Sequence, residues 1–144
     1  MHNVSKMRIN KPACDVFEAF VDPAQIGHFW FSSGDARWEA GRTIKLRYEE
    51  YDADGEIEVI EIVENEKIVF AWHYGEDKHT VAIILTVPET GSTVVEIVED
   101  GFKDSGEGWL ALLVDNKEGW VYMLTCLKAY LEFGISGLRA ALVK

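Results

Sequence analysis

Two hydrophobic periods divide this chain. Between residues 37 and 100, apolar side chains recur at every second position, which is typical of strands with one buried face. Before and after that stretch they recur at intervals of three and four, which is typical of amphipathic helices. We therefore expect an α+β domain in which a group of strands is flanked by helices.

The alternating stretch predicts a meander of five or six antiparallel strands with short turns. Turns are expected at residues 52–55, at Asn65, and at residues 75–78 and 89–92. The first of these turns ends in an Asp-Gly pair, which tolerates positive φ. Adjacent apolar pairs at residues 59–60 and 62–63 break the alternation, so either a bulge or burial of both faces is expected there. The outward residues are largely charged, so the other face of the sheet needs a cover.

The segment before the meander predicts a strand and two short helices. The strand covers residues 3–9, with Val4, Met7 and Ile9 as its apolar side chains. A helix follows from Pro12 to residue 21. Asp22 caps a second short helix, in which Gln25 reaches back to the cap. The apolar side chains of this second helix are Ile26, Phe29, Trp30 and Phe31.

The largest predicted helix covers residues 115–134. Asp115 is expected to cap its start, and Gly134 to end it in the left-handed conformation. Its main apolar stripe is Trp120, Met123, Leu124, Leu127 and Leu131. A second row is Tyr122, Cys126, Tyr130 and Phe133. One sheet face covers only one stripe, so the second requires a cavity, a second chain or the tail of residues 135–144. A separate short helix is expected within residues 104–113.

Composition narrows the range of functions. The 144 residues predict a single domain over residues 1–144, with 48% hydrophobic residues to form a core. The net charge of −11 repels phosphate backbones and anionic lipid, which argues against nucleic-acid or membrane partners. We find no membrane-spanning run and no signal-peptide core, and we expect a cytoplasmic protein. Cys14 and Cys126 have no framework spacing, so we interpret both as reduced core thiols, with a disulfide between them as the alternative.

Several short motifs, in this order, resemble a known superfamily. They are Val16-Phe17-Glu18-Ala19-Phe20 with Asp22-Pro23, Trp30, Ala40-Gly41-Arg42, Gly55-Glu56-Ile57, Ile68-Val69-Phe70-Ala71-Trp72, Gly119-Trp120, and residues 127–132. The chain resembles the START-like superfamily, which includes the birch-pollen allergen and polyketide cyclases. Within it, the chain is similar to homologues of the activator of the ninety-kilodalton heat-shock chaperone's ATPase. The resemblance implies a helix-grip fold, in which a curved antiparallel sheet wraps around the long carboxyl-terminal helix and encloses a hydrophobic cavity. It also suggests a stress-response role.

Candidate ligand-binding residues are those expected between the sheet and the long helix. They are Trp30, Tyr48, Trp72, Ile83, Glu99, Phe102, Trp109, Trp120, Met123 and Leu124. Aromatic walls with a few polar groups are typical of small-molecule sites, although each residue alone also fits ordinary core packing.

Among these candidates, Glu99 is the one with an ionisable carboxyl group. Alternation places it inward with Val95 and Ile97, where burial disfavours a charged carboxyl group. There it could orient a polar group of a ligand. The alternative is a position at the strand end, bonded to a tyrosine or to solvent.

The sequence gives little indication of a metal site or of catalytic residues. His73 and His79 flank the turn at residues 75–78, but an exposed loop with His73 on the outward phase argues against a metal site. We find no nucleophile motif or phosphate loop, so we assign no catalytic residue and no cofactor.

Three functions remain. The first is a protein that binds a small apolar or aromatic ligand. The second is a co-chaperone-like module with a chaperone as partner. The third is an enzyme of the cyclase or dehydratase kind with Glu99 as acid or base. The excess of apolar surface on the long helix also fits a homodimer.

Overall fold

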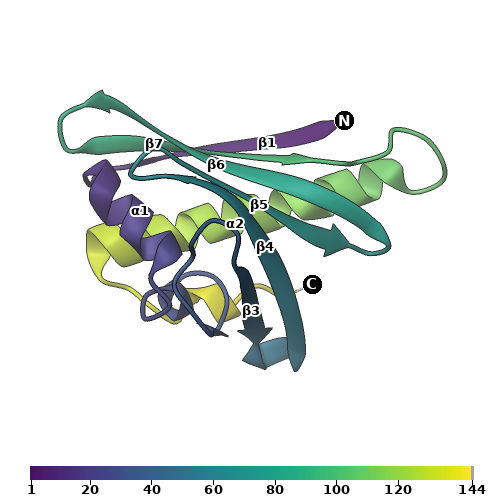
Figure 1. The fold of residues 1–144 in the computed structure, drawn as a ribbon, viewed down its shortest axis with the longest axis horizontal. Coiled ribbons are helices and arrows are strands. Elements are labelled where there is room, and N and C mark those ends of the chain that lie inside the picture. The colour runs from purple at the N-terminus through teal and green to yellow at the C-terminus, as the bar shows by residue number, and fades with distance from the viewer. Residues whose placement is uncertain (144) are drawn as a thin grey trace.

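A computed structural model describes residues 1–143 of the chain (Figure 1). The strands are β1 (His2–Ile9), β2 (Ser33–Gly34), β3 (Thr43–Tyr48), β4 (Ala53–Val63), β5 (Lys67–Tyr74), β6 (Asp77–Glu89) and β7 (Ser92–Asp100). The α-helices are α1 (Ala13–Val21) and α2 (Trp109–Phe133). Single 3₁₀ turns are η1 (Ile26–His28), η2 (Glu49–Tyr51) and η3 (Leu138–Ala140).

The seven strands form one antiparallel sheet in the order β1-β7-β6-β5-β4-β3-β2. The sheet is curved, and α2 runs along its inner side, with α1 and the loop around η1 at one end (Figure 1). This is the predicted α+β helix-grip fold. Consecutive hairpins place β3 to β7 side by side, and β1 returns to pair with β7.

The inward faces predicted for β3 and β5 are confirmed. Ile44 and Leu46 of β3 are buried, as are Ile68 and Phe70 of β5. The expected bulge is present, because the pairing of β4 with β5 shifts register between residues 59 and 61. The side chains that face α2 from these strands form one continuous core.

The phase of β1 differs from the prediction. Its inward face carries Asn3, Ser5 and Ile9, whereas Val4 is only partly buried. Asn3 is accommodated because its Nδ2 atom donates to the backbone oxygen of Leu113 on α2, at 2.9 Å. A polar pair between strand and helix thus replaces the apolar contact that the pattern suggested.

The long helix begins earlier than predicted. Gly108, with φ 81°, precedes α2, which continues without a break through Asp115. The separate short helix and the Asp115 cap were therefore wrong. Nothing between residues 109 and 133 is a strong helix breaker, so the two predicted segments are one. Gly134 ends the helix with φ 66°, as expected.

Two turns near the start of the chain also differ. The β3–β4 turn uses Asp52 in the left-handed conformation, with φ 46°, and Gly55 lies within β4. The second short helix is only the 3₁₀ turn η1. Asp22 does not cap η1, whose first flanking residue is Gln25 without a side-chain cap. Asp22 instead closes the turn before it, because Oδ1 accepts from the backbone N–H of Ala24 at 2.9 Å and Oδ2 accepts from Gln25 Nε2 at 3.2 Å.

The cysteines occupy different environments. Both are free thiols, Cys126 in the core and Cys14 on the exposed side of α1. The prediction of two core thiols was wrong for Cys14, because the buried face of α1 consists of Val16, Phe17, Ala19, Phe20 and Val21.

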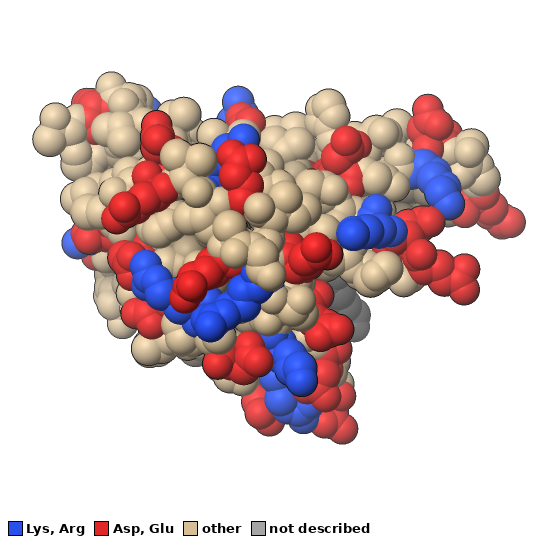
Figure 2. All heavy atoms as spheres, in the orientation of Figure 1, with Lys and Arg blue, Asp and Glu red and all other residues tan. Residues whose placement is uncertain are grey.

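The acidic charge is spread over the surface. Figure 2 shows carboxylates across the face in view, with basic side chains between them, including at the projecting β3–β4 end. There Arg47 binds Asp54 at 2.9 Å and Asp52 at 2.6 Å. Within residues 1–143, no helix combines the length and hydrophobicity needed to cross a membrane.

Candidate functional site

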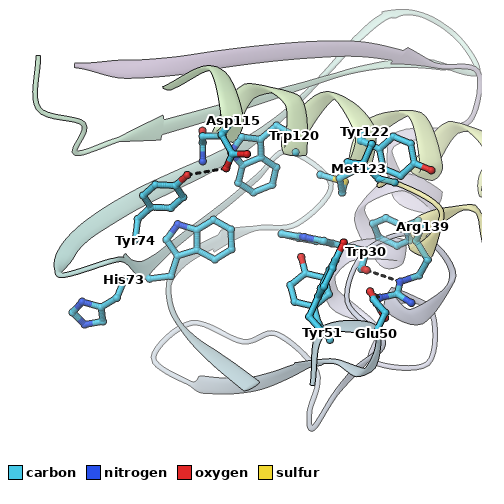
Figure 3. Close-up of a pocket in the computed structure, with 16 residues that line it drawn as sticks. Trp30, Glu50, Tyr51, His73, Tyr74, Asp115, Trp120, Tyr122, Met123 and Arg139 are labelled. Atoms are coloured by element: carbon cyan, nitrogen blue, oxygen red, sulfur yellow. Dashed lines mark hydrogen bonds and ion pairs between the residues drawn. The ribbon is translucent and has the colours of Figure 1, made fainter. Parts of the chain in front are cut away.

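A cavity of about 500 Å³ lies between the sheet and α2. Its described lining residues come from six regions: the loop after η1, the end of β3, the β3–β4 turn, β5, α2 and the tail after α2. They are Phe29, Trp30, Tyr48, Glu50, Tyr51, Trp72, His73, Tyr74, Asp115, Asn116, Gly119, Trp120, Tyr122, Met123, Arg139 and Leu142. Figure 3 shows the cavity with these side chains around it.

Three tryptophans form the central wall. The indoles of Trp72 and Trp120 stack with centroids 5.5 Å apart and planes 26° apart. Trp30 meets both at steep angles, 73° to Trp72 and 61° to Trp120. A stacked pair and a third ring across it form an aromatic corner.

Behind the stacked pair lies Glu99, whose side chain is 0% exposed. Oε1 accepts from Trp120 Nε1 at 2.9 Å and from Asn116 Nδ2 at 3.0 Å. Oε2 accepts from Trp72 Nε1 at 3.3 Å and lies 2.6 Å from Nδ1 of His79. The two indole N–H groups and the amide of Asn116 can only donate, so three donors converge on the two carboxyl oxygens. Which partner donates in the fourth contact depends on the tautomer of His79.

Two aromatic rings pack against the imidazole of His79. Tyr74 stacks on its ring at 5.2 Å, and Phe102 approaches it edge-on at 4.5 Å. Gly101 has φ 122°, and a Cβ atom there would lie 2.6 Å from His79 Cδ2. A side chain at position 101 would therefore displace the imidazole.

Asn116 connects this cluster to the first strand. It donates to Glu99, and its Oδ1 accepts from Asn3 Nδ2 at 3.1 Å. Residues from β1, β5, β6, β7 and α2 thus share one buried hydrogen-bond network. Such a network fixes the rotamers of the indoles that face the cavity.

One end of the cavity is closed by the tail after α2. Arg139 Nε donates to the backbone oxygen of Trp30 at 2.6 Å, and its guanidinium pairs with Glu50 and Ser32. Burial acts to raise the pKa of Glu50. Its own backbone N–H and the hydrogen bond and charge of Arg139 together outweigh this effect, so the pKa lies below its ordinary value.

The other end carries Tyr74 and Asp115. The hydroxyl of Tyr74 donates to Asp115 Oδ2 at 3.5 Å. Figure 3 shows this pair across the cavity from Tyr51, Glu50 and Arg139, while the imidazole of His73 points away. At the β3 wall, burial raises the pKa of the Tyr48 phenol, which therefore remains protonated at neutral pH.

A glycine in the middle of α2 opens onto this space. Gly119 lines the cavity, and a Cβ atom built there would meet no atom within 4 Å. Glycine weakens a helix interior relative to alanine, so its position beside open space keeps volume at a cost in helix stability.

The ten candidate ligand-binding residues fall into two groups. Trp30, Tyr48, Trp72, Trp120 and Met123 line the cavity together. The remaining five, Ile83, Glu99, Phe102, Trp109 and Leu124, are not among the lining residues. Ile83 and Leu124 are core residues, Phe102 packs on His79, and Trp109 starts α2. Glu99 faces inward as predicted, but it is separated from the cavity by the indoles to which it binds. Direct proton transfer to a bound molecule, as the cyclase hypothesis requires, gains no support from this position.

Sequence reasoning missed His79, the lining residues of the tail and Asn116. His79 was placed in an exposed loop, but it lies two residues before Val81 on β6 and shares its inward face. The alternation of β6 could therefore have identified His79 as an inward residue. No sequence pattern could have identified Arg139, because only the tertiary fold brings the tail to the β3–β4 turn. Among the described residues, no group of three His, Cys, Asp or Glu side chains is arranged to hold a metal ion.

Solved structures of other proteins share this fold. Protein SSP2350 from Staphylococcus saprophyticus is 47% identical, with a TM-score of 0.81 over 94% of this chain and 95% of that one. The Aha1 dimer from Colwellia psychrerythraea is 15% identical, with a TM-score of 0.78 over 93% of this chain and 98% of that one. DynU16, described as a putative protein in the dynemicin biosynthetic locus, is 19% identical, with a TM-score of 0.81 over 94% of this chain and 48% of that one. The latter two show the fold alone. None of the curated proteins matches the chain.

The family profile described as "Activator of Hsp90 ATPase homolog 1-like protein" matches residues 10–132, and these include the motifs on which the START-like resemblance rested. By sequence and by fold, the chain belongs to this family.

Proposed function

We propose that this protein binds a small, mostly apolar or aromatic molecule in the cavity between the sheet and α2. The observation that carries this proposal is the cavity itself, about 500 Å³ in volume and walled by Trp30, Trp72 and Trp120. Sites for small ligands typically have volumes of about 300–1,000 Å³, with apolar and aromatic walls and a few polar groups.

The polar groups lie at the ends of this cavity. Glu50 and Arg139 are held at one end, and Tyr74 and Asp115 at the other. An apolar body would fill the centre, where the tryptophans supply contact area, and polar ends would fix its orientation.

Screening against lipids and aromatic metabolites, with thermal shift and tryptophan quenching as readouts, tests this proposal. Gly119→Leu is the blocking variant, because its side chain would extend into the cavity without a backbone clash. Val121→Leu is the matched control, since Val121 is exposed on the same helix. We expect ligands that bind the wild-type chain and the control but not Gly119→Leu. Binding that Gly119→Leu leaves intact would contradict the proposal, as would a screen without any ligand.

One surface supports a second candidate, a protein-binding module. Leu110, Val114 and Val121 share a stripe on the outer side of α2 and are 57%, 60% and 42% exposed. This stripe would suit a chaperone partner of the kind the family description names, or a second copy of the chain. Sedimentation, together with a chaperone ATPase assay, tests it with Val114→Lys as the disrupting variant. A monomer with no effect on the ATPase would reject this candidate.

A further inference from the structure

The buried carboxylate of Glu99 gives the cavity wall an electrostatic character. Its two oxygens each accept one indole N–H, from Trp72 at 3.3 Å and from Trp120 at 2.9 Å. A hydrogen bond to an anion draws the proton of the donor toward it and leaves the donor ring richer in electrons. The faces of an aromatic ring are already the negative part of its quadrupole, so this effect strengthens their attraction for a cation.

The arrangement of the rings suits the same ligand class. Trp72 and Trp120 stack, and Trp30 crosses them at 73° and 61°. Trp30 and Trp120 are 6% and 4% exposed and Trp72 is partly exposed, so a cation in the cavity would meet the accessible parts of this one cluster of packed rings.

The charged groups around the cavity also favour a cationic ligand. Among its described lining residues are two carboxylates, Glu50 and Asp115, and one guanidinium, Arg139. The guanidinium is engaged by Glu50 at the end remote from Tyr74 and Asp115 (Figure 3). The net charge of −11 adds a long-range attraction for cations.

We propose that the ligand is an apolar or aromatic molecule that carries an ammonium group, and that Glu99 sets this preference through Trp72 and Trp120. This inference rests on the proposed function, since it specifies the molecule that the same cavity binds. Glu99 is a specificity-determining residue that acts through the two indoles and does not touch the ligand.

Two isosteric probes separate this inference from simple ligand binding. Phenyltrimethylammonium and tert-butylbenzene have nearly the same shape, and they differ in having a charged nitrogen or a neutral carbon. Burial alone favours the hydrocarbon, because the cation loses hydration. We expect the cation to bind about 5- to 10-fold more tightly, which is within the range of cation–π interactions at partly desolvated sites. The readout is proton–nitrogen correlation NMR, in which the indole N–H signals of Trp72 and Trp120 locate the probe.

The variants test the role of Glu99. Glu99→Gln should bring the two affinities close together, whereas Glu64→Gln, which removes an exposed charge, should leave the preference unchanged. Because Glu99→Gln disturbs a buried network, Trp72→Phe provides a second test. It keeps a ring but removes the N–H that Glu99 accepts, and it should also reduce the preference. Measurements at an ionic strength of about 0.15 M limit the contribution of distant surface charges.

Each outcome has a distinct meaning. Equal affinity for the two probes, or tighter binding of tert-butylbenzene, overturns the inference and leaves the proposed function standing. An equal loss of preference in Glu99→Gln and Glu64→Gln also overturns it, because net charge would then be the cause. If neither probe binds and the cavity takes no other ligand, the proposed function fails as well.

Discussion

The Nδ1 atom of His79 lies 2.6 Å from Oε2 of Glu99, and both side chains are shielded from solvent. They reach each other across β6 and β7, where Val81 pairs with Glu99 and His79 lies two positions earlier. Removing one partner would leave the other buried with an unmet hydrogen-bonding group, which is more costly than losing a surface pair.

His79→Ala should therefore destabilise the fold by about 1–3 kcal/mol, the range for leaving a buried hydrogen-bonding group unmet. Urea unfolding measures the change. Lys103→Ala is the control, because Lys103 makes an exposed ion pair with Asp77 at 2.9 Å, and its loss should shift the midpoint little. Similar midpoints for the two variants would contradict the assigned importance of the buried pair.

Gly101→Ala should destabilise the protein more than Gly91→Ala. Both glycines have positive φ, 122° and 79°, so both variants strain the backbone, by about 1–2 kcal/mol at a left-handed position. Only at Gly101 would the new Cβ also meet the ring of His79, at 2.6 Å. Thermal unfolding of the two variants measures the difference, and equal losses would show that the contact with His79 is unimportant.

Gly119→Ala should stabilise the fold by about 0.5–1 kcal/mol, because alanine favours a helix interior and nothing lies within 4 Å of its Cβ. Denaturant unfolding measures this gain. Ligand affinity in the cavity should be unchanged or reduced by the added methyl group. A destabilised Gly119→Ala variant would indicate that the space beside α2 is filled by side chains.

Acid should release the tail of residues 135–143 from the β3–β4 turn. The pKa of Glu50 is lower in the folded chain than its ordinary value of 4.5. The stabilisation from its pair with Arg139 is therefore fully present above pH 4.5 and is lost as the pH falls through the folded value. Hydrogen exchange of the tail across this range measures the release. In Glu50→Gln the tail should exchange rapidly at every pH, whereas the neighbouring Glu49→Gln should behave like the wild type.

The two thiols should differ in reactivity. Cys14 is exposed, whereas Cys126 is buried, and desolvation raises the pKa of its thiol above 9.0. Because the thiolate is the reactive form, Cys126 should react only when the chain unfolds. A thiol-specific chromogenic reagent should therefore titrate one cysteine in the native protein and two in denaturant. Rapid modification of Cys14→Ser under native conditions would contradict the buried position of Cys126.

Much of the architecture was predictable because it depends on local periodicity. Period-two spacing of the large apolar side chains identified β3 and β5 together with their inward faces, and Gly134 marked the end of α2. The same alternation placed Glu99 correctly. The errors arose where a polar residue occupies an inward position, as Asn3 does in β1, or where capping residues lie inside a helix, as Asp115 does. For Asn3 a tertiary partner on α2 overrides the local pattern, whereas Asp115 lies inside α2 because no strong breaker interrupts the helix there.

The sequence by itself thus determined most of the elements, most of their buried faces and the family, because each depends on side-chain spacing along a single segment. Only the tertiary structure decided which groups meet. It brought His79, Asn116 and two indoles from three different elements onto the carboxylate of Glu99, and it brought Arg139 of the tail onto Glu50. The physical reason is that strand register and the packing of α2 across the sheet fix these contacts, and neither is encoded within a single segment.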